Sequence, residues 1–279
     1  MSVAVIIPCY NRAPLLARAV DSVLAQTTPP DEIIVVDDGS TDNTASLIRT
    51  RYGAKVQYIH QVNTGVSAAR NNGIQAAHAD WLTFLDSDDE WLREKLDQQW
   101  RVIQSEPHCW IVHGDEIWIR DGHRVNPMAK HAKCGGMIYQ HCLPLCAISP
   151  SAVMIHREVF TSIGLFDESL PVCEDYDLWL RITARYPVHY IPRALIIKYG
   201  GHADQLSRRH WGMDRFRIAS LVKMLESGAL SATDSAATIQ TLQKKIDVYL
   251  QGARKRGKHE EVALYTSLKQ NHCRSGALV

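Results

Sequence analysis

A cluster of carboxylates follows a short apolar segment at residues 81–90, WLTFLDSDDE. The apolar part, residues 81–85, carries aromatic and branched side chains without a charge, which predicts a buried strand. Asp86, Asp88 and Asp89 then lie within four residues and repel one another unless a positive charge lies between them. A divalent cation held by few carboxylates takes its remaining ligands from water and substrate phosphates. The segment therefore indicates either a metal site for a phosphate-bearing ligand or an acidic turn that caps the next helix.

Two other polar loops also follow predicted strands. An apolar strand at residues 3–7 ends at PCYNR, and another at residues 32–36 ends at DDGSTD, which begins with Asp37 and Asp38. Helical spacing of apolar residues follows each strand, which indicates parallel βαβ units whose carboxyl ends meet at one edge of a sheet. The chain has no GxGxxG and no GxxxxGK[ST] motif, which disfavours a dinucleotide-dependent dehydrogenase and a P-loop protein.

The remaining elements are expected to complete an α/β architecture. Predicted strands lie at residues 56–60, 110–119, 148–155, 189–191 and 195–199, and predicted helices at about 14–26, 63–77, 92–104, 157–163 and 175–185. Residues 130–145 show no clear period. From residue 210 the chain is rich in Ala, Leu, Lys and Gln, which indicates a helical extension with a break at 227–234.

Composition excludes several classes of protein. The 279 residues carry 31 Lys and Arg against 30 Asp and Glu, so the net charge of +1 does not favour nucleic-acid binding. No apolar segment approaches about 20 residues, and the N-terminus lacks the pattern of a signal peptide, so we expect a cytoplasmic protein without a membrane span. The basic run at 254–258 is read as a solvated helix end, with contact to acidic lipid on the inner membrane face as the alternative.

The seven cysteines are scattered and form no CxxC pair, which is typical of reduced thiols in an intracellular protein. One group could in principle hold zinc, but its spacing matches none of the standard zinc patterns, so we expect no zinc site. Its members are His131, Cys134, His141, Cys142 and Cys146.

Five segments, taken in order, resemble glycosyltransferase family 2 over about residues 3–207. They are VIIPCYNR, VVDDGSTDNT, NTGVSAARNNG, FLDSDD and EDYDLWLR. The resemblance implies the GT-A fold, a Rossmann-like mixed sheet flanked by helices. It further implies a domain at 1–209, with a nucleotide-binding half at about 1–105 and an acceptor-binding half at 106–209. The helical extension at 210–279 matches no motif of the family. The QxxRW motif of processive members is absent, so we expect one sugar to be added per encounter.

The resemblance also implies roles for the first two loops. Pro8, Tyr10 and Arg12 match the first nucleotide loop of the family, where Tyr10 would lie against the base. Asp38 matches the acid that accepts a hydrogen bond from the base, with Asp37 in support. Each of these acids would also suit a tight turn that caps a helix.

Further positions would handle the diphosphate and the metal. Arg70 matches a basic residue near the diphosphate, Asp86 would contact the ribose or the sugar, and Asp88 would bind Mn²⁺ or Mg²⁺ directly. His202 falls where some members of the family have a histidine near the metal. Asp175 matches the catalytic base, although an acid at that position would equally suit the first turn of a helix.

The resulting hypothesis is an inverting, metal-dependent transferase. It would move a sugar from a nucleotide-diphosphate donor, with UDP as the expected carrier, to a saccharide or lipid-linked acceptor in envelope polysaccharide synthesis. Two alternatives remain open at this point: a nucleotidyltransferase that makes a nucleotide sugar, and a non-catalytic module that binds one. For the helical extension, homodimerisation, membrane contact and acceptor binding are equally open.

Overall fold

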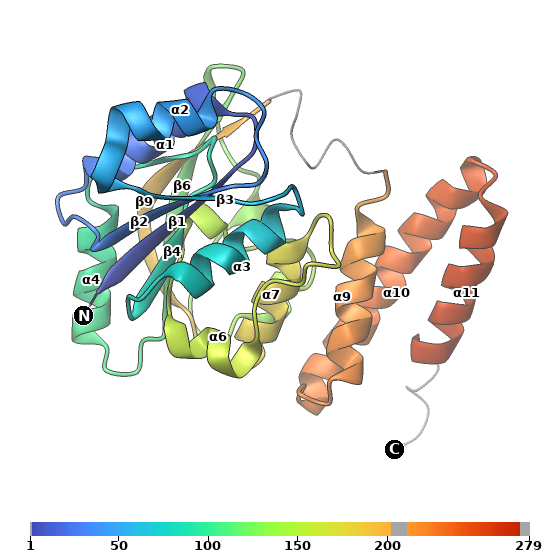
Figure 1. Cartoon of the computed structure of the whole chain (residues 1–279). Coiled ribbons are helices and arrows are strands. Elements are labelled where there is room, and N and C mark those ends of the chain that lie inside the picture. The colour runs from blue at the N-terminus through green and yellow to red at the C-terminus, as the bar shows by residue number, and fades with distance from the viewer. Residues whose placement is uncertain (1, 202–210, 274–279) are drawn as a thin grey trace.

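A mixed β-sheet forms the centre of the molecule in a computed structural model, which describes residues 2–201 and 211–273 (Figure 1). Within these residues the sheet has nine strands in the order β3-β2-β1-β4-β8-β6-β9-β5, with β7 paired to β6. The predicted α/β class with a mixed sheet is therefore confirmed.

The first half of the sheet is parallel. Strands β1 (Val3–Cys9), β2 (Glu32–Asp37), β3 (Gln57–His60) and β4 (Trp81–Phe84) run in one direction, with β1 in the middle. Every residue of β1 is buried, because helices cover both of its faces, and this explains its uninterrupted apolar sequence. The parallel strands bring the loops after β1, β2 and β4 to one edge, as expected.

The second half of the sheet is mostly antiparallel. Strand β8 (Met154–His156) joins β4 to β6 (Ile111–Arg120), β7 (His123–Val125) forms a hairpin with β6, and β5 (Glu90–Trp91) pairs with β9 (His189–Gly200). The prediction of two strands at 189–191 and 195–199 was wrong. They form one strand, interrupted in register where Gly114 pairs with Ile191 and Asp115 with Ala194, because Pro192 cannot donate a ladder hydrogen bond.

Helices cover the two faces of the sheet unequally. Helices α1 (Ala13–Leu24) and α4 (Lys95–Ser105) bury apolar side chains on one face, and α3 (Val66–Ala76), α6 (Arg157–Ile163) and α7 (Glu174–Thr183) on the other. Gly73 lets α3 approach β1 closely, since a Cβ there would lie 2.4 Å from Ile6 Cγ2. The remaining short helices are α2 (Thr44–Leu47), α5 (Tyr139–Cys142), a π-helix (Ile48–Tyr52) and three 3-10 helices (Gly53–Lys55, Ala129–His131, Pro150–Ala152).

Several predicted elements differ from the structure. The strand expected at 148–155 is confined to β8, and residues 150–152 form a 3-10 helix instead. The helix expected at 92–104 begins at Lys95, because Glu90 and Trp91 pair with β9. The stretch 130–145, predicted without a period, contains α5 and a 3-10 turn.

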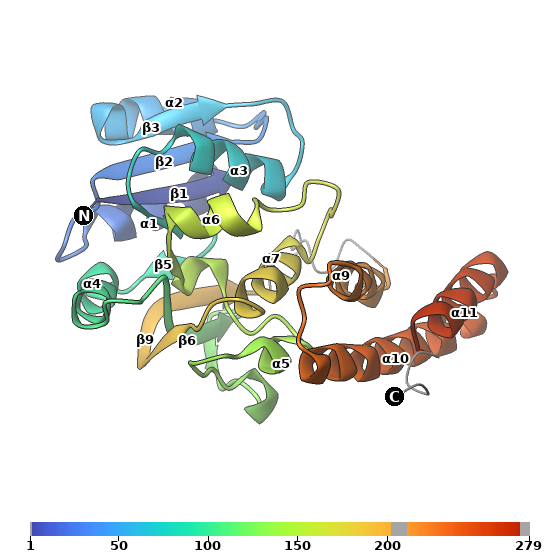
Figure 2. The ribbon, with the colours of Figure 1, turned by 90° about the horizontal axis from the view of Figure 1, so that it is seen from below.

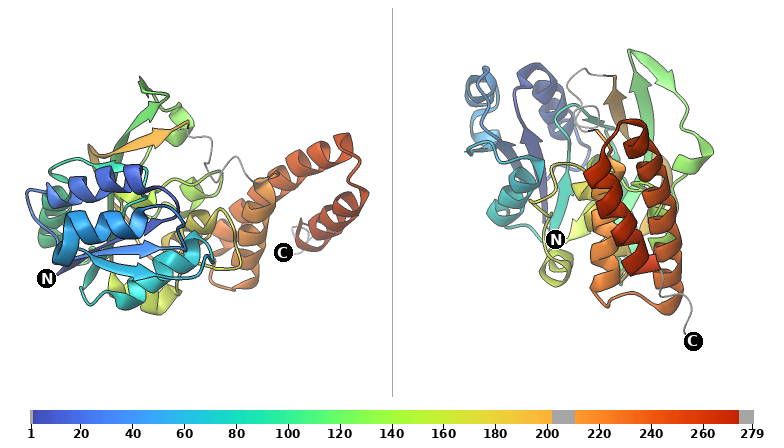
Figure 3. Two further views of the ribbon diagram at one scale, coloured as in Figure 1. Left: turned by 45° about the horizontal axis from the view of Figure 1, so that its top comes forward. Right: turned by 90° about the vertical axis from the view of Figure 1, so that its right-hand side faces the viewer.

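Three helices form the C-terminal extension: α9 (Asp214–Glu226), α10 (Ala232–Lys255) and α11 (His259–Cys273). Figures 2 and 3 show α9 beside α7, with α10 and α11 extending away from the sheet. Ile218, Leu221 and Met224 of α9 belong to the same apolar core as Tyr176 and Trp179 of α7. Trp179 is thus a core residue.

Polar contacts also join the extension to the loop before β8. The Tyr139 hydroxyl lies 2.8 Å from Thr238 Oγ1, and Lys245 Nζ donates to the Pro144 carbonyl oxygen at 2.9 Å. The extension therefore packs against α7 and braces the segment that follows α5.

The basic run at 254–258 has defined partners. The Arg256 guanidinium and the Lys258 ammonium lie 5.3 and 3.9 Å from the centre of the Trp211 ring, within the range of cation–π contact. The prediction that this basic run is a solvated helix end therefore holds only in part, because Arg256 and Lys258 contact the Trp211 ring. Within residues 2–201 and 211–273, no helix is both long and apolar enough to cross a membrane.

Lys95 is a fully buried lysine side chain on the α4 face of the sheet. Its Nζ donates to Thr83 Oγ1 at 2.9 Å and to Gln99 Oε1 at 2.8 Å, and lies 3.8 Å from the centre of the Trp91 ring. No ion pair joins it to a carboxylate in the described part of the chain. Burial lowers the pKa of Lys95 well below its usual value.

This burial predicts a pH dependence of stability. Between the lowered pKa and the ordinary value near 10.4, the unfolded chain binds more protons than the folded one, so stability rises with pH by up to about 1.4 kcal/mol per unit. In urea unfolding at pH 7 and pH 9 we expect Lys95→Met to lose this rise, while the exposed control Lys55→Met retains it. Parallel profiles for wild type and Lys95→Met would contradict the assignment.

Candidate functional site

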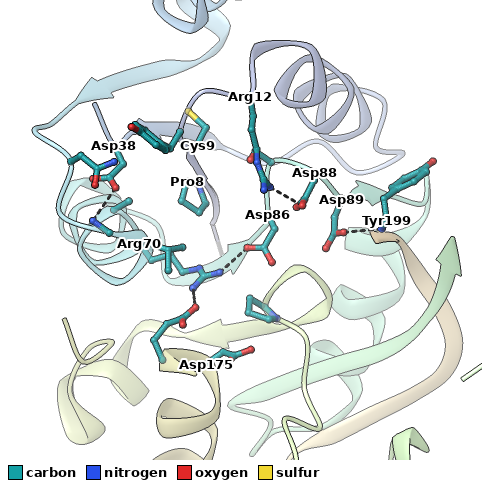
Figure 4. Close-up of a pocket in the computed structure, with 18 of the residues that line it drawn as sticks. Pro8, Cys9, Arg12, Asp38, Arg70, Asp86, Asp88, Asp89, Asp175 and Tyr199 are labelled. Atoms are coloured by element: carbon teal, nitrogen blue, oxygen red, sulfur yellow. Dashed lines mark hydrogen bonds and ion pairs between the residues drawn. The ribbon is translucent and has the colours of Figure 1, made fainter. Parts of the chain in front are cut away.

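One pocket of about 560 Å³ lies where the carboxyl ends of β1, β2 and β4 meet the start of α7 and the end of β9 (Figure 4). Of the residues predicted from the sequence, eight line it together: Pro8, Tyr10, Arg12, Asp38, Arg70, Asp86, Asp88 and Asp175. Asp37 does not line it, and His202 lies outside the described residues. Segments separated by more than 160 residues therefore contribute to a single cavity.

The loop after β2 forms the part of the pocket assigned to the base. Asp38 Oδ1 accepts a hydrogen bond from the Thr64 backbone N–H at 2.9 Å, and Oδ2 accepts one from the Gly65 N–H at 2.9 Å. These bonds fix the carboxylate against the start of α3. Asp37 is fully buried and accepts from the Ser40 N–H at 2.8 Å and from the Tyr58 hydroxyl, so it shapes the loop rather than contacting a ligand.

The loop after β1 is fixed by Asn11, which has a positive φ of 51°. Its Oδ1 accepts from the Thr41 N–H at 2.7 Å and ties the first loop to the second. A left-handed asparagine costs less than other non-glycine residues, and such strain often accompanies functional loops. Tyr10 is 40 % exposed at the mouth of the pocket, where a planar ligand could stack on it.

The acidic loop after β4 is electrostatically crowded. Arg12 Nη1 binds Asp88 Oδ2 at 2.7 Å. Burial, with the neighbouring Asp86 carboxylate, nevertheless raises the pKa of Asp88. Asp89 is more deeply buried, accepts from Ser151 Oγ at 2.7 Å, and has its pKa raised well above the usual value by that burial. Additional positive charge would stabilise these carboxylates.

Arg70 joins the two halves of the pocket. Its side chain is only 3 % exposed, with Nη2 at 2.7 Å from Asp86 Oδ1 and Nη1 at 2.7 Å from Glu174 Oε1. Although burial opposes it, the Arg70 charge lowers the pKa of Asp86, whereas burial and the adjacent Asp175 raise the pKa of Glu174. Arg70, which was expected to contact the diphosphate, thus forms ion pairs with the loop after β4 and with the start of α7.

Asp175 lies in the first turn of α7, on the wall opposite Asp38 and Arg12 (Figure 4). The helix is preceded by Cys173, which has a left-handed φ of 63°. Asp175 Oδ1 accepts from the Tyr176 N–H at 2.7 Å, and Oδ2 lies 3.1 Å from the Cys146 sulfur. Asp175 is therefore both an acid in the first turn of a helix and a carboxylate that lines the pocket, so its position fits either of the two predicted roles, helix stabilisation or catalytic base.

Several further residues line the pocket, and among them Asp89, Lys198 and Tyr199 were given no individual role from the sequence. Lys198 Nζ donates to Ser149 Oγ at 3.3 Å, and although burial opposes it, the surrounding Glu116, Asp89 and Asp86 raise the pKa of Lys198. The Tyr199 N–H donates to Asp89 Oδ1 at 3.2 Å. For Lys198 and Tyr199 the signal was a polar pair at the end of a predicted strand, just before a Gly-Gly dipeptide, whereas Asp89 belongs to the acidic cluster at residues 86–89.

By chemical type, Asp88 suits a divalent cation that would take its other ligands from water and substrate phosphates. Within residues 2–201 and 211–273, no three His, Cys, Asp or Glu residues are grouped as a complete metal site. Asp88 is a partly buried carboxylate in the pocket, and carboxylate and phosphate oxygens are the preferred ligands of Mg²⁺ and Mn²⁺. A site of this kind would be completed by ligand phosphates.

The group considered for zinc has other partners. His141 Nε2 lies 2.7 Å from the Ala132 carbonyl oxygen, Cys142 is buried in the core, and Cys146 contacts Asp175.

Comparison with known proteins identifies relatives. The model of glycosyl transferase family 2 matches residues 4–163. An uncharacterized glycosyltransferase of Rickettsia felis is 32% identical over 213 residues, covering 74% of this chain and 35% of that protein. The chain thus spans about a third of that relative's length. The putative teichuronic acid biosynthesis glycosyltransferase TuaG of Bacillus subtilis is 30% identical over 215 residues, covering 75% of this chain and 82% of that protein.

Solved structures share the fold at low sequence identity. S. aureus TarS 1-349, in complex with UDP-GlcNAc, has a TM-score of 0.77 at 18% identity, covering 95% of this chain and 79% of that one. The mannosyltransferase PcManGT of Pyrobaculum calidifontis, in complex with GDP-Man and Mn²⁺, has a TM-score of 0.62 at 19% identity, covering 96% and 83%. With the family match over more than half of its length, the chain belongs to glycosyltransferase family 2 and has the GT-A fold.

Proposed function

We propose that this chain transfers one sugar from a nucleotide-diphosphate sugar to an acceptor hydroxyl in the synthesis of an envelope polysaccharide. The observation that carries the proposal is the single pocket that collects Asp38, Arg12, Asp88 and Asp175. TuaG and a second relative, the putative colanic acid biosynthesis glycosyl transferase WcaA of Escherichia coli (29% identical over 201 residues, covering 66% of this chain and 67% of that protein), are named for envelope polysaccharides.

The positions around the pocket suggest how the donor lies. The base would stack on Tyr10 and bond to Asp38, and the diphosphate would lie near Asp88 and Arg12. Asp88 would hold Mn²⁺ or Mg²⁺, which when bound acts as a Lewis acid on the diphosphate leaving group. His202 remains a proposed further ligand. The sugar would then lie between the diphosphate and Asp175.

Asp175 would act as the general base. An acceptor hydroxyl is a poor nucleophile, and a carboxylate that takes its proton during attack contributes about 10²–10⁴-fold in rate. Attack from the side of Asp175, opposite the diphosphate, would displace the leaving group in one step and invert the configuration at the anomeric carbon. Asp89, Lys198 and Tyr199 also line the pocket and would contact the sugar or the acceptor.

Calorimetric titration tests the proposal. UDP, dTDP, GDP and CMP are titrated with and without Mn²⁺ into wild type, Asp88→Ala and the control Asp97→Ala, which changes an acid of α4 outside the pocket. We expect Mn²⁺ to tighten binding of one diphosphate, UDP, by more than about tenfold, and we expect Asp88→Ala to lose this dependence.

The Asp88→Ala variant distinguishes nucleotide binding through the metal from nucleotide binding through Arg12. Any binding that remains should be independent of Mn²⁺, because the proposed metal ligand is absent while Arg12 can still meet the diphosphate. Mn²⁺-dependent binding of full strength in Asp88→Ala would refute the metal assignment. Failure of all four nucleotides to bind wild type would refute the proposed function.

A further inference from the structure

Cys146 lies directly behind the carboxylate that we assign as the base. Its sulfur is 3.1 Å from Asp175 Oδ2 and 3.2 Å from the Ile148 carbonyl oxygen. It is not among the residues that line the pocket, whereas Asp175 is. The thiol therefore touches the carboxylate from the protein side and leaves the pocket side of Asp175 free to meet a ligand.

The thiol is a hydrogen-bond donor at neutral pH. Burial, followed by the nearby Asp175 charge, raises the pKa of Cys146 well above its usual value, so the sulfur keeps its proton. A single S–H can serve only one acceptor at a time, and a charged carboxylate is a stronger acceptor than a neutral carbonyl. A protonated sulfur is also a poor nucleophile. The role that remains for Cys146 is therefore to orient the Asp175 carboxylate through its hydrogen bond.

The segment that carries Cys146 is braced from two directions. The Tyr176 hydroxyl, next to Asp175 on α7, donates to the Leu143 carbonyl oxygen at 2.6 Å. Lys245 of α10 donates to the Pro144 carbonyl oxygen at 2.9 Å. Because α7 and the C-terminal extension both hold this segment, the distance between Cys146 and Asp175 is fixed by the fold rather than by a flexible loop.

We propose that Cys146 is a positioning residue that holds the Asp175 carboxylate in the orientation in which it faces the pocket. The inference rests on the proposed role of Asp175 as the base. With Oδ1 bound to the Tyr176 N–H and Oδ2 to the thiol, neither carboxylate oxygen can rotate away without losing a bond. Other ionisable groups lie around this pair: Glu174 and Cys173 of α7 and its cap, Arg70 of α3, Lys198 of β9 and Cys142 of α5.

The test compares Cys146→Ala and Cys146→Ser with the control Cys142→Ala, which removes a buried thiol without contact to Asp175. Loss of the donor in Cys146→Ala should move the acid limb of the kcat profile to higher pH by about half to one unit, with an unchanged Kd for the nucleotide. The serine hydroxyl, a stronger donor, should keep the limb at or below its wild-type position. Cys142→Ala should leave it unchanged.

A second readout needs no catalysis. Carbon-detected NMR titration of the aspartate carboxyls without nucleotide, with the signal assigned through Asp175→Asn, should show the same upward shift in Cys146→Ala. If wild type transfers no sugar yet this signal moves, the proposed function fails and the positioning role stands. If neither the acid limb nor the carboxyl signal moves, or if Cys142→Ala moves them equally, the inference is overturned.

Discussion

Replacing Asp175 by Asn is expected to lower kcat for sugar transfer by about 10²–10⁴-fold while the donor nucleotide still binds within about twofold of wild type. The amide keeps the size of the carboxylate, and its single oxygen can still accept one of the two hydrogen bonds, from the Tyr176 N–H or from the Cys146 thiol. It cannot take a proton from the acceptor hydroxyl. The loss should therefore appear in kcat and not in the calorimetric Kd.

The matched control is Asp97→Asn, which changes an acid on α4 outside the pocket and should retain full turnover. Turnover at the wild-type level in Asp175→Asn would remove the base assignment. Loss of nucleotide affinity together with kcat would instead place Asp175 in donor binding.

Replacing Arg70 by Met is expected to lower the free energy of unfolding by about 3–5 kcal/mol at neutral pH. The guanidinium is almost fully buried between Asp86 and Glu174, so its removal leaves two carboxylates near each other without a counter-charge. Breaking a buried ion pair from one side is costly because the remaining charge stays desolvated. Urea unfolding at pH 7 measures the loss directly.

The pH dependence of the Arg70→Met variant separates this cause from a simple packing defect. Without Arg70, both carboxylates bind protons more readily in the folded chain than in the unfolded chain, so the deficit should shrink as the pH falls from 7 towards 5. The surface control Arg101→Met removes an ion pair with Asp97 whose arginine is 71% exposed, and should change stability by less than about 0.5 kcal/mol. A pH-independent deficit, or one below about 1 kcal/mol, would contradict the role of Arg70 as counter-ion.

The extension at 210–279 and the preceding domain share one apolar core, which bears on how the chain is divided. Ile218 and Leu221 pack with residues of α7. Thr238 contacts α5, and Lys245 contacts the segment that carries Cys146. The domain boundary at residue 209 therefore remains a prediction. In the structure the extension packs against α7, the helix that carries the proposed base Asp175.

Local patterns in the sequence were sufficient for the class of fold and for most of the pocket. An apolar strand followed by polar residues recurs at residues 3–12, 32–42 and 81–89, and parallel pairing necessarily brings such loops to one edge. That is why the sequence alone predicts that Pro8, Tyr10, Asp38, Asp86 and Asp88 lie together.

The partners of the buried charges were decided only by tertiary packing. Arg70 and Glu174 are 104 residues apart, and nothing in either segment specifies that they meet. The same holds for Cys146 and Asp175, and for Lys198, which reaches the pocket from the last strand. Spacing along the chain determines which face or edge a residue occupies, whereas which charge it meets there depends on how distant elements pack, and that packing is set by the whole core at once.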